Sequence, residues 1–146
     1  MIVLLALAFT LALVPAVPTT AMEPLRGEME LGFTGPTNPL WTGTISGDIN
    51  GDMFFYAMDS KDVGQVHHFW EVWNITTDDG DLIIIEGIDK GVVSWKNDKY
   101  RMNGVVTEAT GNWEYLEGRK VHMSGYITFD PDTGFPATAP GTFRVN

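Results

Sequence analysis

The residue with the clearest chemical potential in this sequence is Glu71, which lies between Phe69 and Trp73 at a spacing of two. On an extended strand, residues two apart project from the same face, so the three side chains would share one surface. If that face lines a cavity, the carboxyl group loses water and its pKa rises, which suits acid–base chemistry or the holding of a polar ligand atom. If the face points outward, Glu71 is a solubilising charge between aromatic side chains. We take the first reading as the hypothesis and Glu71 as the candidate catalytic residue.

Two tyrosines and a methionine complete the candidate binding set. Tyr56 and Tyr100 could supply polar groups near a cavity, and Met102 shares a strand face with Tyr100. The sequence shows no Ser–His–Asp spacing, nucleophile elbow or phosphate loop. The predicted ligand-binding residues are Glu71, Phe69, Trp73, Tyr56, Tyr100 and Met102.

Metal sites are not predicted, although two patterns resemble them. His67 and His68 are neighbours on an expected strand and point to opposite faces, so a site would need a third ligand such as His122 to converge in space. The segments 48–52 and 130–134 place oxygen ligands as a calcium loop begins, but Asp, Asn and Gly are also turn formers. We interpret both segments as hairpin turns and predict no metal and no cofactor.

The elements that would position these residues are short strands. After residue 21 the chain is a series of alternating runs cut by Gly, Pro, Asn and Asp, which is the all-β pattern. Asn50-Gly51 is the strongest hairpin signal, and residues 78–80 and 96–98 are expected to form further tight turns. The pattern favours an eight-stranded antiparallel up-and-down β-barrel, with a β-sandwich as the alternative. The expected strands are 28–34, 40–48, 52–58, 65–76, 81–87, 91–95, 100–107, 121–129 and 142–145.

Two of these runs are apolar on both faces. In 52–58, Phe54 and Tyr56 oppose Met53 and Phe55, and 65–76 also carries aromatic residues on both sides. A barrel wall of this kind needs a cover on its outside. We expect a subunit interface, hence a homo-oligomer, and the alternative is a terminal segment folded back over the wall.

The first 21 residues are uncharged, and they predict an export signal. An apolar run, broken only by Thr10, is followed by Pro15, Pro18 and small residues at Thr19 and Ala21, which predicts cleavage near Ala21. Nothing basic precedes the apolar run, so a retained N-terminal anchor is the alternative. Residues 22–146 then form a single barrel domain, secreted and without membrane attachment after cleavage.

The composition of the chain limits which binding partners are expected. The chain has 19 acidic and 9 basic residues, a net charge of −10, and no cysteine. This charge repels nucleic acid and anionic lipid, so neither is an expected partner. Without disulfides, the domain has to be stabilised by its core, and five Trp, eight Phe and four Tyr can supply one.

The segment 91–125 carries a family resemblance. Its two alternating runs flank a short aromatic corner bounded by Gly111 and Gly118. Through Ala109, Thr110, Gly111, Trp113, Leu116, Gly118 and Gly125 it resembles the corner of the allene oxide cyclase-like barrel, the architecture that dirigent proteins share. The resemblance covers about a quarter of the chain. It implies an exported, commonly oligomeric eight-stranded barrel with an apolar cavity at one end, and it transfers no catalytic residue.

These observations lead to one prediction of function and two alternatives. We expect a secreted β-barrel that binds or encloses a small apolar molecule. The first alternative is a cofactor-free isomerase or cyclase of the allene oxide cyclase-like type. The second is a structural or adhesive surface protein. A pocket with converging polar groups favours the first two, whereas a barrel packed solid with side chains favours the third.

Overall fold

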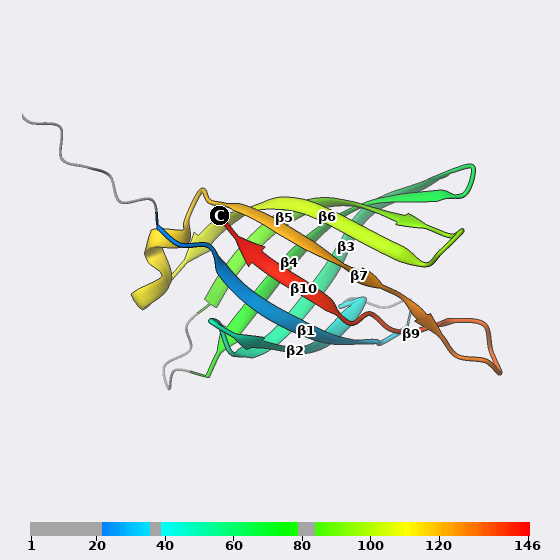
Figure 1. Ribbon diagram of the computed structural model, residues 1–146, viewed down its shortest axis with the longest axis horizontal. Helices are drawn as coiled ribbons and strands as arrows, with labels where there is room; N and C mark the ends of the chain where they lie inside the picture. Colours follow the sequence, from blue (N-terminus) through cyan, green and yellow to red (C-terminus); the bar gives the residue numbers. More distant parts are fainter. Residues whose placement is uncertain (1–21, 36–38, 79–83) are drawn as a thin grey trace, which may run out of the picture.

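The computed structural model describes residues 22–35, 39–78 and 84–146, and its main feature is a closed, eight-stranded antiparallel β-barrel (Figure 1). Neighbours in sequence are neighbours in the barrel, which confirms the up-and-down topology and excludes the sandwich. The barrel strands are β1 (Leu25–Phe33), β2 (Trp41–Gly47), β3 (Gly51–Val63), β4 (Val66–Thr77), β5 (Ile84–Ser94), β6 (Lys99–Ala109), β7 (Lys120–Tyr126) and β10 (Gly141–Val145).

The barrel closes where its first and last strands meet. β10 pairs with β1 from Leu25↔Val145 to Met29↔Gly141, and its other edge pairs with β7. Both edges of β10 are therefore paired at this seam. The closed barrel thus lacks the unpaired backbone groups that the edges of an open sheet expose.

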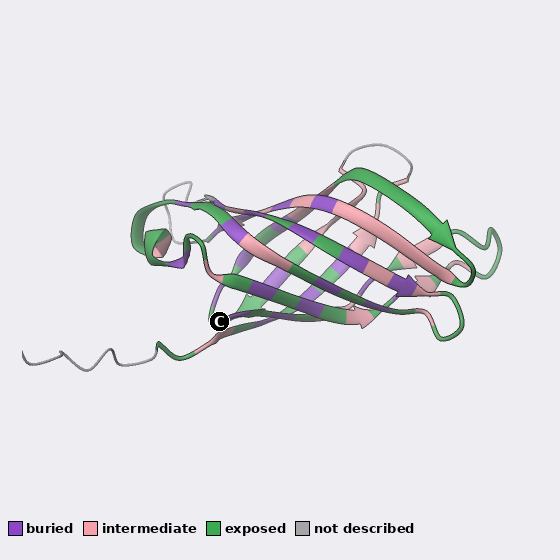
Figure 2. Cartoon of the chain, turned by 90° about the horizontal axis from the view of Figure 1, so that it is seen from above, coloured by how far each residue is buried: buried purple, intermediate pink, exposed green. Residues whose placement is uncertain are grey.

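Side chains alternate between the barrel interior and its outer surface, as Figure 2 shows in the bands of buried and exposed residues along the strands. On β4, for example, Trp73 and Ile75 are fully buried, while Asn74 between them is partly exposed. The period-two pattern of the sequence thus assigns the apolar face of each strand to one common core.

One end of the barrel is closed by the aromatic corner. A 3₁₀-helix, η1 (Gly111–Leu116), follows β6 and places Leu116 in the core with no exposed surface. Gly111 and Gly118 have φ angles of +60° and +76°, which side chains other than glycine rarely adopt. The Gly118 amide donates to the Val106 carbonyl at 2.9 Å. The predicted corner is confirmed.

The opposite end is the mouth of the barrel. The β3–β4 and β5–β6 hairpins extend there, at the right of Figure 1, beside a small hairpin of β8 (Thr128–Phe129) and β9 (Pro136–Thr138). β9 attaches to β1 through Gly32↔Thr138. Within the part of the chain that the structure describes, no helix is long and apolar enough to span a membrane.

Two details of the predicted strands were wrong. The break between 81–87 and 91–95 does not exist, because β5 is continuous. The run 121–129 is interrupted at Ile127, where the chain leaves the barrel to form β8. The hairpin expected at Asn50-Gly51 is confirmed, since β2 and β3 pair there from Ile45↔Gly51, and Gly47 carries the positive φ of +131°.

Two predictions fall wholly or partly beyond these residues. The expected leader, residues 1–21, lies outside the described residues, as does most of the expected turn at 78–80. The turn at residues 96–98 is confirmed, with Asp98 at a φ of +56°.

Candidate functional site

A cavity of about 170 Å³ opens at the mouth of the barrel. Its walls come from the mouth halves of the strands and from the β8–β9 segment. The residues that form its apolar lining include Leu31, Phe55, Phe69, Val93, Tyr100 and Met102. Glu71 lies among them, so the hypothesis that its face looks into a cavity is supported by the structure.

Glu71 faces a second carboxyl group on the neighbouring strand. The β4–β5 register pairs Glu71 directly with Asp89, and both side chains point into the barrel with 5% of their surface exposed. Cross-strand partners on one face have their Cβ atoms roughly 5 Å apart, so the two groups are immediate neighbours. Sequence reasoning found Glu71 and missed Asp89.

Glycines on β5 leave room for the aromatic rings on either side of Glu71. A Cβ atom at Gly87 would collide with the ring of Trp73, and one at Gly91 would collide with the ring of Phe69. Both aromatic rings from β4 therefore lie across β5, above its glycines. Asp89 occupies the one position between Gly87 and Gly91 where β5 has an inward side chain, directly opposite Glu71.

The next strand, β6, has a glycine beside Asp89 and so leaves room for its side chain. A Cβ atom at Gly104 of β6 would come within 2.7 Å of the Asp89 Cβ atom. Both carboxylate oxygens of Asp89 are buried and have no hydrogen-bond partner among the described residues. Such groups are rare in folded proteins, because an unpaired buried polar group destabilises the folded state.

Burial dominates the electrostatics of the pair. It raises the pKa of Glu71 to about 8, with the negative charge of Asp89 as the second cause. Burial also raises the pKa of Asp89 to about 7. Among the described residues, neither group forms an ion pair with a basic side chain. Near neutral pH, the pair therefore holds protons that ordinary carboxyl groups would have released.

Tyr100 is the third polar side chain inside the mouth half. Its hydroxyl donates to the carbonyl oxygens of Pro140 at 3.3 Å and Ala139 at 3.4 Å. Its pKa is raised above the usual value by burial, and then by the charges of Glu71 and Glu30. Tyr100 is thus a neutral hydroxyl group that already has acceptors for its proton.

Aromatic side chains form the rim of the mouth. The Trp95 ring centroid lies 5.6 Å from that of His67 and 6.3 Å from that of Phe129. The His67 Nδ1 atom lies 2.8 Å from Asp62 Oδ1, and this hydrogen bond lowers the pKa of Asp62. His67 is therefore engaged at the rim by Asp62.

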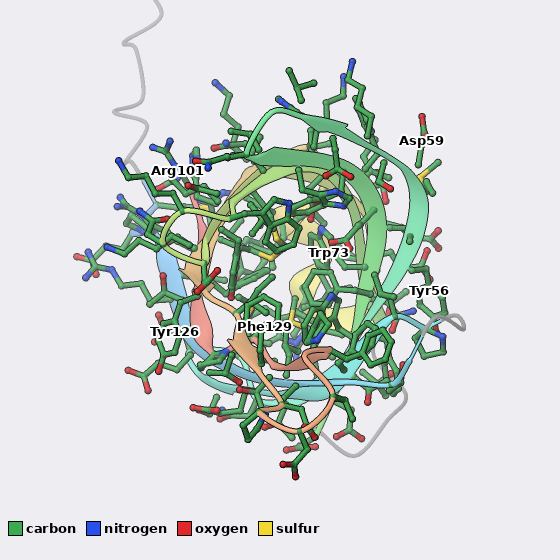
Figure 3. The ribbon with its side chains drawn as sticks, turned by 90° about the vertical axis from the view of Figure 1, so that its right-hand side faces the viewer. Tyr56, Asp59, Trp73, Arg101, Tyr126 and Phe129 are labelled. Atoms are coloured by element: carbon green, nitrogen blue, oxygen red, sulfur yellow. The ribbon has the colours of Figure 1, made fainter. Side chains whose placement is uncertain are left out.

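The structure separates the predicted ligand-binding residues into three groups. Glu71, Phe69, Tyr100 and Met102 line the cavity together. Trp73 is fully buried and lies one step deeper, toward the closed end. Tyr56 projects from the outer surface, as Figure 3 shows in a view into the mouth, because Phe55 takes the inward position on β3. Tyr56 therefore leaves the candidate set.

The residues considered as metal ligands do not converge. His122 lies on β7 with its Nδ1 atom 2.6 Å from Asn103 Oδ1, on the outer surface rather than at the rim with His67. No three His, Cys, Asp or Glu side chains within 22–35, 39–78 and 84–146 come together as a metal site.

The two calcium-like segments use their oxygen atoms in turns. Asp130 Oδ1 accepts hydrogen bonds from the amides of Asp132 at 2.8 Å and Thr133 at 3.0 Å, which lower the pKa of Asp130. Asp48 Oδ2 accepts from the Arg26 amide at 2.8 Å. The interpretation of these segments as turns agrees with the structure.

Comparison of the chain with protein-family models, curated proteins and solved structures gives no match. The resemblance of 91–125 to the allene oxide cyclase-like barrel therefore stays a prediction.

Proposed function

We propose that this protein binds a small, mainly apolar molecule in the mouth of its barrel. The observation that carries this proposal is the apolar cavity with the buried carboxyl group of Glu71 in its wall. Concave apolar sites with few, well-placed polar groups are the usual form of small-molecule sites. A barrel packed solid throughout would have favoured the structural or adhesive alternative.

The cavity volume limits the bound part of the ligand. An apolar cavity of about 150 Å³ accommodates benzene. A space of about 170 Å³ therefore has room for one six-membered ring with a short substituent. Because the cavity opens at the rim, a longer molecule would extend outward past Trp95.

The position of Glu71 gives the ligand a defined orientation. Burying a carboxyl group away from water destabilises the fold, so a hydrophobic residue here would be more stabilising. Perturbed groups of this kind gather at functional sites. We assign Glu71 the role of holding the polar atom of the ligand, while Phe69 and Met102 contact its apolar part.

The proposal is tested by native mass spectrometry of protein purified from its own source. We expect a retained small mass on the wild-type protein, and its loss from Ala139→Phe, which fills the cavity from a buried lining position. Ser124→Phe, at an exposed outer position, is the matched control and should keep the mass. A mass retained by Ala139→Phe would place the ligand elsewhere.

A cofactor-free isomerase or cyclase is the second candidate function. The specific observation is the carboxyl pair, because burial raises both pKa values toward neutral pH, where a carboxyl group can both accept and donate a proton. Glu71 would exchange a proton with the substrate, and Asp89 would tune it from behind. Once the ligand is identified, Glu71→Gln should still bind it. Conversion by wild type that is lost in this variant would establish the enzyme.

Export and self-association stay predictions. For the second, the structure offers an outer apolar strip formed by Tyr56, Val72, Ile88 and Val105, which are successive cross-strand partners on β3 to β6. Ile88 is 46% exposed. We propose a second copy of this chain as the cover of this strip.

A further inference from the structure

We propose that the ligand is a cation: a small amine in its ammonium form, carried on one ring or a short apolar body, with its nitrogen against Glu71 and the charge of Asp89 behind it. This inference rests on the proposed function and names the chemical class of the molecule that enters the cavity.

The first reason is the charge of the site. The titratable groups that line the cavity are Asp59 and His67 near the rim and Glu71 and Tyr100 within, and Asp89 stands behind Glu71. Three of these five are acids. His67, the only potential cation among them, is already engaged by Asp62. Each of these acids, once ionised, would repel a bound anion and attract an ammonium group.

The second reason is that the site contains two buried carboxyl groups. A neutral ligand needs one hydrogen-bonding group, which Glu71 supplies. Asp89 would then add only the destabilisation of two buried, unpartnered oxygen atoms. A cation gives Asp89 a role, because one ammonium charge balances the single negative charge that the two neighbouring carboxyl groups carry when one of them keeps its proton. The pair is better matched to an ammonium ion than to a carbonyl or hydroxyl group.

The third reason is the composition of the walls. Phe69 and Tyr100 flank Glu71 in the lining, and Trp41 and Trp95 lie nearer the rim. Cations are stabilised over the faces of aromatic rings, most strongly over Trp and where water is excluded. The same walls accept the apolar part of an amine, so both halves of the ligand find matching surfaces.

Proton balance gives the inference a distinctive signature. With pKa values of about 8 for Glu71 and about 7 for Asp89, the empty pair retains protons near neutral pH. An arriving ammonium ion replaces a bound proton as the compensating charge, so binding should release protons to the buffer. A neutral ligand of the same shape should release none.

The test compares 2-phenylethylamine with its neutral analogue 2-phenylethanol by titration calorimetry at pH 7.5. Measurements in phosphate and in Tris, which differ in ionisation enthalpy, count the protons released. We expect the wild-type protein to bind the amine at least about tenfold more tightly than the alcohol, a difference of about 1.4 kcal/mol. Proton release should accompany the amine alone.

Variants then test which carboxyl group causes the preference for the amine over the alcohol. Glu71→Gln preserves shape and removes the charge, so it should lose the preference for the amine while still binding the alcohol. Asp89→Asn should reduce the preference. Glu108→Gln removes an exposed carboxyl group on the outer surface and should leave the preference unchanged. Near-ultraviolet circular dichroism verifies the fold of each variant, and proton release by the wild type needs no variant.

Each result has one meaning. If the wild-type protein binds the alcohol as tightly as the amine, or binds the amine without releasing protons, the cation inference is overturned and the proposed binding function stands. If neither probe binds, both are overturned. If the amine preference persists in Glu71→Gln, the attraction comes from the acidic surface, and the inference is again wrong.

Discussion

The two ends of the barrel interior are built on the same strands and differ in how they are filled. Toward the closed end, inward side chains such as Ile75, Ile85 and Leu116 are fully buried, and the 3₁₀-helix closes the opening. Toward the mouth, the same strands leave a cavity and carry Glu71 and Asp89. The closed end has the composition of a core, and the mouth has that of a site.

This difference shows that strand alternation assigns a face but does not determine what the face does. On β4, Ile75 and Glu71 are both inward and both buried. Only Ile75 stabilises the fold by burial, because removal from water favours an apolar group and disfavours a carboxyl group. We therefore expect stability to reside at the closed end and ligand chemistry at the mouth.

The largest expected effect comes from replacing phenylalanine by alanine, and we compare this substitution at a buried position and at an exposed one near the mouth. Phe143→Ala removes a ring with 1% exposure that packs edge-on against Trp73 at 5.5 Å, so we expect a loss of about 3–5 kcal/mol. Phe135→Ala near the mouth removes a ring that is 66% exposed, and we expect a change within about 0.5 kcal/mol. Urea unfolding measures both. Equal losses would break the comparison.

The second effect is a loss of folding stability with rising pH, which originates in the carboxyl pair at the mouth. Folding raises the pKa of Glu71 from 4.5 to about 8 and that of Asp89 from 3.8 to about 7, so the folded state holds protons that the unfolded state releases. The free energy of unfolding should therefore fall as pH rises from about 5 to 7, by about 2–3 kcal/mol for each of the two groups. Urea midpoints across this range test the sign.

Glu71→Gln is the matching variant for this pH dependence. It should flatten the dependence of stability on pH, because one of the two groups no longer titrates, whereas Glu108→Gln on the outer surface should leave that dependence as it is. Stability that rises between pH 5 and pH 7 in the wild type would mean that the carboxyl pair is hydrated.

The third effect is smaller and concerns backbone conformation at the two ends. Gly118 and Gly64 both have positive φ, +76° and +62°, and a Cβ atom at either would meet nothing within 4 Å. Gly118→Ala should destabilise the barrel by about 1–2 kcal/mol through strain alone. Gly64→Ala, at the tip of the β3–β4 hairpin, should cost about half of that or less, because local unfolding relieves it. Thermal melts compare the two.

The smallest effect on folding is expected outside the barrel. Ile88→Lys replaces a half-exposed residue of the outer apolar strip, so the unfolding free energy of the monomer should change by less than about 0.5 kcal/mol. If a second copy covers this strip, the same variant should abolish self-association in sedimentation velocity, because it buries a charge at the contact. Unchanged sedimentation would place the interface elsewhere.

The fold was predictable because its signals are local. Alternating runs and turn residues identified the barrel, and Gly111 and Gly118 marked the corner whose positive φ angles the structure shows. The β8–β9 hairpin was missed because the run through Ile127 alternates without interruption in the sequence. Its departure from the barrel depends on pairing with β1, which is a long-range contact.

The site was half predictable for a similar reason. Glu71 was recognised by the aromatic residues two positions away on each side. Asp89 has glycines at the same spacing, Gly87 and Gly91, and glycine in a strand is usually read as a break. The two patterns are complementary, since the rings of one strand lie over the glycines of the other. A search for such paired patterns would have found Asp89.

The seam between β1 and β10 determines which part of the barrel forms last. The two edges of β10, residues Gly141–Val145, complete the pairing of β7 and of β1, where Leu25 pairs with Val145. Until β10 is in place, the other barrel strands form an open sheet with two unpaired edges. Contacts this distant in sequence are slow to form, so barrel closure is a late step of folding. A chain that ended before Gly141 would keep both edges open, and such edges promote aggregation.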